Sequence, residues 1–123
     1  MRYMTLLKGT PPASGPPPEL MAAIIALGEE ATKAGALLDT AGLAPSAQGA
    51  RVQLADGKIT VTDGPFAEAK EMISYALYQV GSREEATEWA SRFMKLHRDL
   101  WDGWEGDVDV LRVFGPEDFA PDS

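Results

Sequence analysis

Cysteine is absent from this chain of 123 residues, and its one histidine is His97. The absence of cysteine excludes disulfides, thiolate metal ligands and cysteine nucleophiles. Zinc sites draw on several Cys and His side chains, so one histidine argues against zinc, and no loop has the ligand spacing of an EF-hand. The chain also lacks a glycine-rich phosphate loop, a dinucleotide fingerprint and a G-x-S-x-G motif. We therefore expect neither a metal nor a cofactor.

Long apolar runs and positive charges are also scarce. No stretch approaches the roughly 20 apolar residues that span a bilayer, and Met1 to Lys8 lack the pattern of a signal peptide. Both observations predict a cytoplasmic protein without membrane contact. The chain has 19 Asp and Glu against 11 Lys and Arg, and the resulting net charge of −8 repels a phosphate backbone. We expect no direct binding to nucleic acid.

Length and composition predict one globular domain over residues 1–123. Hydrophobic residues make up 45% of the chain and charged residues 24%, and a chain of this length buries roughly two-thirds of its unfolded surface. Residues 9–18 contain five prolines and two glycines, which predicts a flexible loop that could close over a site as a lid. Residues 115–123 form a polar, proline-rich tail that we expect to pack loosely.

Hydrophobic periodicity in the first half of the chain predicts strands around one helix, followed by a hairpin. The dipeptide Asp56-Gly57 is favoured in two-residue hairpin turns, and the flanking alternation predicts one buried hairpin face. The predicted elements are a strand at 2–8, a helix at 19–35, a short strand at 36–39, and hairpin strands at 51–55 and 58–62.

The second half repeats a strand, a helix and a strand. A capping box, with Ser82 at the cap and Glu85 three residues later, predicts where the second helix begins. That helix should bury a stripe that ends at His97. The predicted elements are a short run of helix formers at 67–71, a strand at 73–80, a helix from 82 to 97 and a strand at 108–114.

This order of elements predicts an α+β fold of the ferredoxin-like type, β-α-β-β-α-β, with an extra β-hairpin. Two helices would cover one face of the sheet. The other face still carries apolar side chains and needs a cover. We therefore expect a homodimer, with twofold symmetry as the commonest arrangement.

The turn at Asp63-Gly64-Pro65-Phe66 combines an Asx-turn former, a permissive glycine, a fixed proline and a large apolar anchor. One interpretation is a purely structural corner that ends a strand and pins it to the core, followed by a solvated Lys70–Glu71 pair. The other is that Asp63, Lys70 and Glu71 present charge at the edge of a cleft.

Residues 63–71 read Asp-Gly-Pro-Phe-Ala-Glu-Ala-Lys-Glu, which resembles the signature of the YCII-related family in its DGPF branch. The opening residues 1–4, the hairpin that leads into the signature, and the segment 112–119 also look like that branch. The resemblance covers nearly the whole chain. Two positions depart from the pattern: Ala69 stands where threonine is common, and Ser74 where glycine is frequent.

The resemblance implies a ferredoxin-like fold that dimerises as an α+β barrel. Related barrels include muconolactone isomerase-like enzymes and cofactor-free monooxygenase-like proteins. The resemblance also implies His–Asp acid–base chemistry, with His97 and Asp63 as the catalytic candidates here. Some family members accompany or are fused to alternative sigma factors, which implies a regulatory partner.

His97 titrates near neutral pH and suits a general base. Its alternatives are a satisfied histidine at the core edge and a favourable charge at a helix end. Trp101 and Trp104 either cap the core or line a pocket or dimer contact. Arginines either bind an anionic ligand or form surface ion pairs. The candidate substrate-binding residues are Arg51, Lys70, Glu71, Tyr75 and Trp101.

Two functions remain open at this point. The first is a cofactor-independent enzyme that transfers a proton on a small organic acid or lactone, in a cleft between sheet and helices. The second is a non-catalytic ligand-binding or regulatory dimer linked to a sigma factor, because an acidic surface suits a basic protein partner. A core closed by its own side chains would exclude both.

Overall fold

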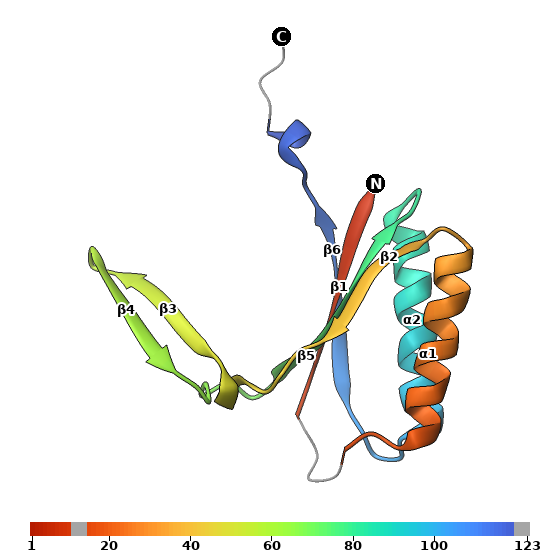
Figure 1. Cartoon of the computed structure of the whole chain (residues 1–123), viewed down its shortest axis with the longest axis horizontal. Coiled ribbons are helices and arrows are strands. Elements are labelled where there is room, and N and C mark those ends of the chain that lie inside the picture. The colour runs from red at the N-terminus through yellow and green to blue at the C-terminus, as the bar shows by residue number, and fades with distance from the viewer. Residues whose placement is uncertain (11–14, 120–123) are drawn as a thin grey trace.

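The computed structural model describes residues 1–10 and 15–119 (Figure 1). Residues 11–14 of the predicted lid and 120–123 of the predicted tail lie outside the described part. Four antiparallel strands form the main sheet, in the order β2-β5-β1-β6. Their bounds are β1 (Arg2–Gly9), β2 (Leu37–Gly42), β5 (Glu71–Gln79) and β6 (Gly106–Val113).

Two helices, α1 (Pro18–Lys33) and α2 (Arg83–Leu100), lie side by side on one face of this sheet (Figure 1). A separate hairpin of β3 (Ala50–Ala55) and β4 (Lys58–Asp63) is inserted between β2 and β5. Two short 3-10 turns, η1 (Ser46–Gln48) and η2 (Pro116–Asp118), complete the described elements. The α+β class is confirmed, and the arrangement is compatible with the predicted ferredoxin-like fold.

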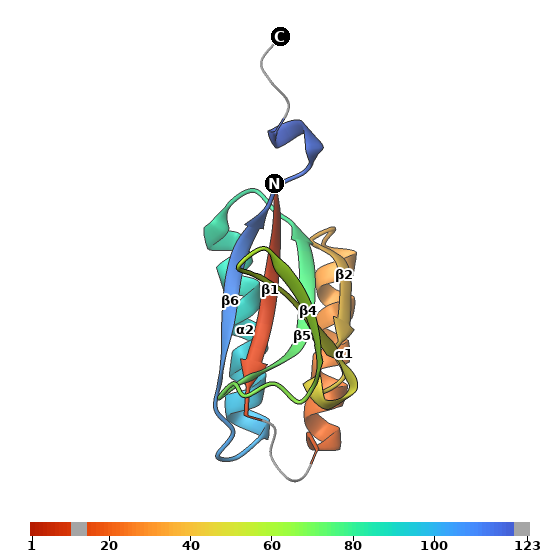
Figure 2. The ribbon, with the colours of Figure 1, turned by 90° about the vertical axis from the view of Figure 1, so that its left-hand side faces the viewer.

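The core forms where β1 and β5 face the helices. The alternation in β1 places Tyr3, Thr5 and Leu7 in the interior, while the residues between them are half-buried on the outer face. The buried core cluster consists of Tyr3, Ala31, Ala36, Tyr78, Val80 and Ala86. The sheet therefore has one packed face and one face that no other described element covers (Figure 2).

The start of α2 follows the predicted capping box. The Ser82 hydroxyl accepts a hydrogen bond from the Glu85 amide at 3.1 Å, and the Glu85 carboxylate accepts one from the Gly81 amide at 2.8 Å. These bonds satisfy amides that have no partner inside the helix. The cap fixes the helix so that its stripe, which includes Ala86, Ala90 and His97, faces the interior.

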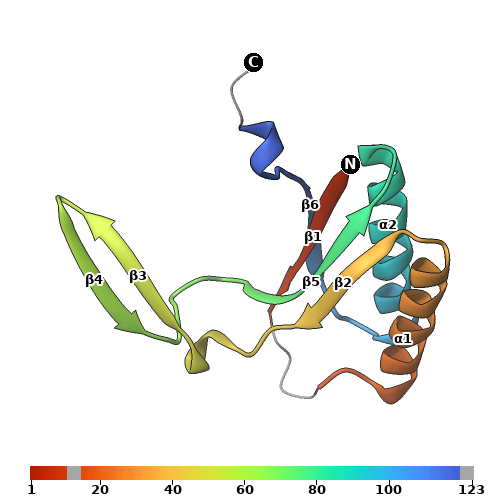
Figure 3. The ribbon, with the colours of Figure 1, turned by 45° about the horizontal axis from the view of Figure 1, so that its top comes forward.

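Three local predictions need correction. Residues 67–70 form no helix: the Glu68 amide bonds the Phe66 carbonyl in a tight turn, Ala69 and Lys70 form bends, and β5 begins at Glu71. Phe66 is only half-buried and lies outside the core cluster, so the corner is not pinned to the core. The expected buried face of the hairpin is exposed, since β3 and β4 project away from the sheet (Figure 3).

No helix in the described ranges is both long enough and apolar enough to cross a bilayer.

Candidate functional site

A cavity of about 490 Å³ lies between the helices and the end of the sheet where β1 and β2 finish and β5 begins. Residues from β1, α1, β2, β5 and α2 line it, and Gly15 and Pro16 contribute from the loop before α1. Most of the lining is apolar. The polar side chains in the lining are Thr40, Glu71, Ser74 and His97, with the indoles of Trp101 and Trp104 beside them. An apolar pocket with a few convergent polar groups is typical of a small-molecule site.

His97 is the titratable group of this cavity that is most deeply buried, with 3% of its surface exposed. Its Nδ1 lies 2.9 Å from the Phe93 carbonyl oxygen. A carbonyl only accepts, so Nδ1 carries the proton and donates it. Burial lowers the pKa of His97 below its usual value, although the bond to Phe93 acts in the opposite direction. The ring is therefore neutral at pH 7, and its Nε2 has a free lone pair.

Aromatic rings surround this imidazole. The ring centroids of Phe93 and Trp104 each lie 4.7 Å from that of His97, and the Trp101 centroid lies at 6.5 Å. Trp101 and Trp104 stack on each other at 5.7 Å. The rings help to bury the imidazole, which favours its neutral form, and they offer flat apolar surfaces to a ligand.

The Trp104 ring packs against two glycines that pair across the sheet, Gly9 of β1 and Gly106 of β6. A Cβ at Gly9 would lie 2.9 Å from the Trp104 ring, and one at Gly106 would lie 2.3 Å from it. Only glycine leaves room for the indole at these positions. Among the described residues, Trp104 Nε1 is the one buried side-chain nitrogen or oxygen without a hydrogen-bond partner.

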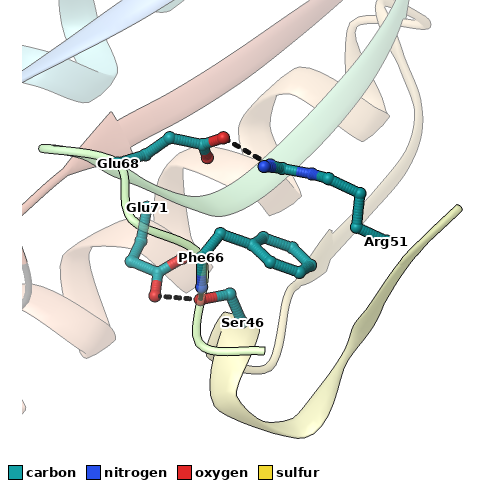
Figure 4. Close-up of polar contacts among 5 residues, drawn as sticks. All are labelled: Ser46, Arg51, Phe66, Glu68 and Glu71. Atoms are coloured by element: carbon teal, nitrogen blue, oxygen red, sulfur yellow. Dashed lines mark hydrogen bonds and ion pairs between the residues drawn. The ribbon is translucent and has the colours of Figure 1, made fainter. Parts of the chain in front are cut away.

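Glu71, which pairs with Gly9 at the start of β5, adds a carboxylate to the lining of the cavity. Its Oε1 accepts a hydrogen bond of 2.6 Å from the hydroxyl of Ser46, which is itself buried (Figure 4). The same hydroxyl accepts a hydrogen bond of 3.1 Å from the Phe66 amide. Ser46 therefore joins the corner at residues 63–66 to a residue that lines the cavity.

The corner is held by backbone and aromatic contacts. The Gly64 amide donates to the Gly49 carbonyl at 2.9 Å, and a Cβ at Gly64 would lie 1.6 Å from the Ser46 carbonyl oxygen. The Arg51 guanidinium lies 4.1 Å from the centroid of the Phe66 ring and forms an ion pair with Glu68 (Figure 4). The predicted ligand-binder Arg51 thus has two partners within the chain.

A second cavity, of about 550 Å³, shares His97, Trp101 and Trp104 with the first. It is more polar, and Lys70 and Asp107 lie in its lining. These two side chains form an ion pair, and the Lys70 ammonium lowers the pKa of the Asp107 carboxyl below its usual value. The indole pair therefore stands between an apolar cavity and a polar one.

Of the remaining predicted residues, Asp63 lies apart from this centre, and Tyr75 lines a smaller adjoining cavity of about 60 Å³. Asp63 is exposed at the end of β4 and lines none of these cavities. The Tyr75 hydroxyl donates to the Asp39 carboxylate at 2.8 Å, and this bond raises the pKa of the phenol. The structure thus brings together His97, Trp101 and Glu71 around one cavity, with Lys70 at its neighbour, while Arg51 and Asp63 belong to the hairpin.

Sequence reasoning missed Ser46 as a site residue and did not single out Trp104 as a hydrogen-bond donor. A serine in a Gly/Pro/Ser loop carries no signal of burial. The two glycines against which Trp104 packs are almost a hundred positions apart in the sequence, so only the register between β1 and β6 shows that they pair. In the described ranges, no three His, Cys, Asp or Glu side chains are grouped closely enough to hold a metal ion.

The fold and site define a small α+β domain with a histidine-containing cavity between helices and sheet. Residues 1–101 match the model of the YCII-related domain. The match covers most of the chain, so the chain belongs to the YCII-related family. No curated protein gives a significant match.

Proposed function

We propose that the chain binds a small organic acid or lactone in the cavity between sheet and helices, where His97 acts as a general base without a cofactor. The neutral imidazole that lines an apolar cavity carries this proposal. The corner at residues 63–66 also supports placement in the DGPF branch of the family. No catalytic step is assigned to Asp63.

The tautomer of His97 supports this role. With Nδ1 bound to the Phe93 carbonyl, the free lone pair is on Nε2, which can accept a proton from a bound molecule. A base that is neutral at pH 7 needs no prior deprotonation. Trp104 Nε1 offers a donor beside it, which suits a carbonyl oxygen that gains negative charge as the neighbouring carbon loses its proton.

The dimensions and lining of the cavity limit the ligand. A volume of about 490 Å³ accommodates a small molecule, and the mostly apolar lining favours a ring or short hydrocarbon with one polar end. The polar end would face His97 and Trp104. Glu71 in the lining would disfavour a second negative charge on the ligand.

The experiment is exchange of the proton on the carbon next to the carbonyl of simple γ-lactones and small arylacetic acids in D₂O, followed by NMR. His97 would remove a proton and return a deuteron to the same carbon, so no co-reactant is needed. We expect exchange above the buffer rate with the natural chain and a loss of at least about 100-fold in His97→Gln. Ser91→Ala, an exposed change on the same helix, is the matched control.

The alternative function is a non-catalytic ligand-binding or regulatory dimer, and the same samples distinguish it. Ligand-induced shifts of the Trp101 and Trp104 indole signals without exchange would favour binding alone. The sigma-factor link rests on the resemblance to family members that accompany sigma factors, and the net charge of −8 suits a basic protein partner. Recovery of a sigma factor with tagged natural chain from cell extract, at low and moderate salt, would support that link.

We propose further that the chain acts as a homodimer through the outer face of the sheet. This face carries Met4, Leu6, Leu77 and Leu111, and no described element packs on it. Light scattering that reports a particle of 13.2 kDa at micromolar concentration would contradict the dimer.

A further inference from the structure

The β3–β4 hairpin, which we call the arm, is amphipathic, and its apolar face is uncovered. Val52 pairs with Val61 and Leu54 pairs with Ile59, so all four side chains point to the same face of the ribbon. Their exposed fractions are 67% for Val52, 74% for Leu54, 71% for Ile59 and 67% for Val61. The opposite face is polar and includes Gln53, Lys58, Thr60 and Thr62.

The arm has little support from the rest of its own chain. Its strands pair with each other, and its turn at Asp56-Gly57 has the positive φ angles of 52° and 74° that a tight hairpin needs. An isolated two-stranded hairpin is marginally stable in water, and four exposed branched apolar residues on one face are costly. Both facts indicate that the arm is built to be covered.

The outer face of the main sheet is the matching surface. Leu111 and Met72 on this face are 53% and 56% exposed, and the apolar residues between them are half-buried. The arm leaves the molecule on the side of this face, opposite the helices (Figures 1 and 2). The arm and the uncovered sheet face therefore lie on the same side of the molecule.

We propose that the arm of each chain packs its apolar face against the outer sheet face of a second copy, in a reciprocal exchange. This inference rests on the homodimer proposed above and adds the arm as its second contact surface. In a twofold dimer each copy supplies one arm and one sheet face. The same twofold rotation therefore covers both kinds of uncovered surface on both copies. A partner of another kind would need two separate apolar surfaces, one for the arm and one for the sheet face.

The charges on the sheet face allow a second acidic chain to approach. Asp109 pairs with Lys8 at 2.5 Å, and Asp107 pairs with Lys70. Each of these two carboxylates thus has a lysine within the same chain, and the face is locally balanced despite the net charge of −8. A balanced, largely apolar face fits a copy of the chain better than a strongly basic partner.

The first test uses two charge-neutral double variants of the full chain. Leu54→Glu with Ile59→Lys places charges on the apolar face of the arm, and Gln53→Glu with Thr60→Lys places the same charges on its polar face. We expect sedimentation to show a dimer dissociation constant at least 100-fold higher for the first variant and unchanged for the second. Thermal unfolding and tryptophan fluorescence confirm that the helix–sheet core remains folded in both, since the arm has few contacts with it.

The outcomes separate the two proposals. A natural chain that is monomeric would overturn both the dimer and the arm exchange. A dimer that survives unchanged in Leu54→Glu with Ile59→Lys would leave the dimer standing and overturn the role of the arm. Neither result bears on proton exchange at His97, which is measured separately.

The second test uses the absence of cysteine, which allows each introduced thiol to be the only one. A chain with Leu54→Cys is mixed with a differently tagged chain with Leu111→Cys or Met72→Cys and treated with a short bismaleimide. Arm exchange predicts a cross-linked pair of the two tags and none from Leu54→Cys alone. The arm would not lie on the partner's sheet if Leu54→Cys cross-linked with itself. The same would hold if it cross-linked with neither Leu111→Cys nor Met72→Cys.

Discussion

His97 and Phe93 are linked by a hydrogen bond of 2.9 Å from the ring nitrogen Nδ1 to the backbone oxygen one turn earlier on α2. This bond fixes the tautomer, because a carbonyl oxygen cannot donate. It also holds the ring among Phe93, Trp101 and Trp104. The tautomer of the one histidine that lines the cavity therefore depends on a backbone contact within a single helix.

The first prediction concerns the dependence of stability on pH. Burial lowers the folded pKa of His97 below its usual 6.5, so the unfolded chain binds more protons as the pH falls through 6.5. The contribution of neutral His97 to the free energy of unfolding is therefore fully present above pH 6.5. It is lost below pH 6.5, at up to ~1.4 kcal/mol per pH unit over the range in which only the unfolded form is protonated. We expect urea unfolding to show this loss between pH 7.5 and 5.5.

His97→Gln is the control for that slope, because His97 is the only histidine. The variant should lose the dependence between pH 7.5 and 5.5 and keep the changes at lower pH that come from carboxylates such as Asp107. NMR titration of the single imidazole in the folded natural chain should give a pKa below 6.5. A value above 6.5 would contradict the assignment.

The second prediction concerns Ser46. Its hydroxyl donates to Glu71 and accepts from the Phe66 amide, and it is buried. Ser46→Ala leaves both partners without this bond, so we expect a loss of about 1–3 kcal/mol in the free energy of unfolding. Ser91→Ala on the exposed side of α2 should change it by less than about 0.5 kcal/mol. Equal effects in urea titrations would mean that water replaces the hydroxyl.

The sequence predicted the order of strands and helices, because these depend on local periodicity and on caps such as Ser82. It also predicted His97 on an inward-facing stripe, since the spacing from Ala86 and Ala90 is helical. The register that pairs Gly9 with Gly106 was not predictable, because it depends on contacts between distant segments. Residues that act through such pairs, including Trp104, therefore carried no local signal of their role.

The hairpin shows a different reason for a wrong prediction. Its alternation and its Asp56-Gly57 turn predicted the strands correctly. Periodicity shows which face is apolar but does not show what covers that face. The expected burial of Val52 and Leu54 failed because no other part of the described chain reaches them.

The third prediction concerns the packing of the Trp104 ring against Gly106. A Cβ at Gly106 would lie 2.3 Å from the Trp104 ring and 2.6 Å from the Lys8 carbonyl oxygen. Gly106→Ala must displace the indole or the strand, at a cost of about 1–3 kcal/mol. Gly42→Ala is the control, because its Cβ would meet nothing within 4 Å. Urea unfolding measures the cost, and a shift of tryptophan emission in Gly106→Ala alone would report the displaced ring.

The last prediction concerns the donor of Trp104. Its Nε1 is buried without a partner, so a bound carbonyl oxygen would satisfy it. Trp104→Phe keeps an aromatic ring and removes the N–H. We expect the variant to bind a γ-lactone about 3- to 10-fold more weakly, the worth of one hydrogen bond, as measured by NMR titration.

A ring hydrocarbon of the same size, without oxygen, controls for lost packing in Trp104→Phe. Its affinity for the natural chain and the variant should be nearly equal, because it cannot accept a hydrogen bond. If both ligands lost affinity equally, the indole would act only as an apolar wall. Because the hydrocarbon isolates the contribution of shape, the difference between the two ligands measures the N–H of Trp104 directly.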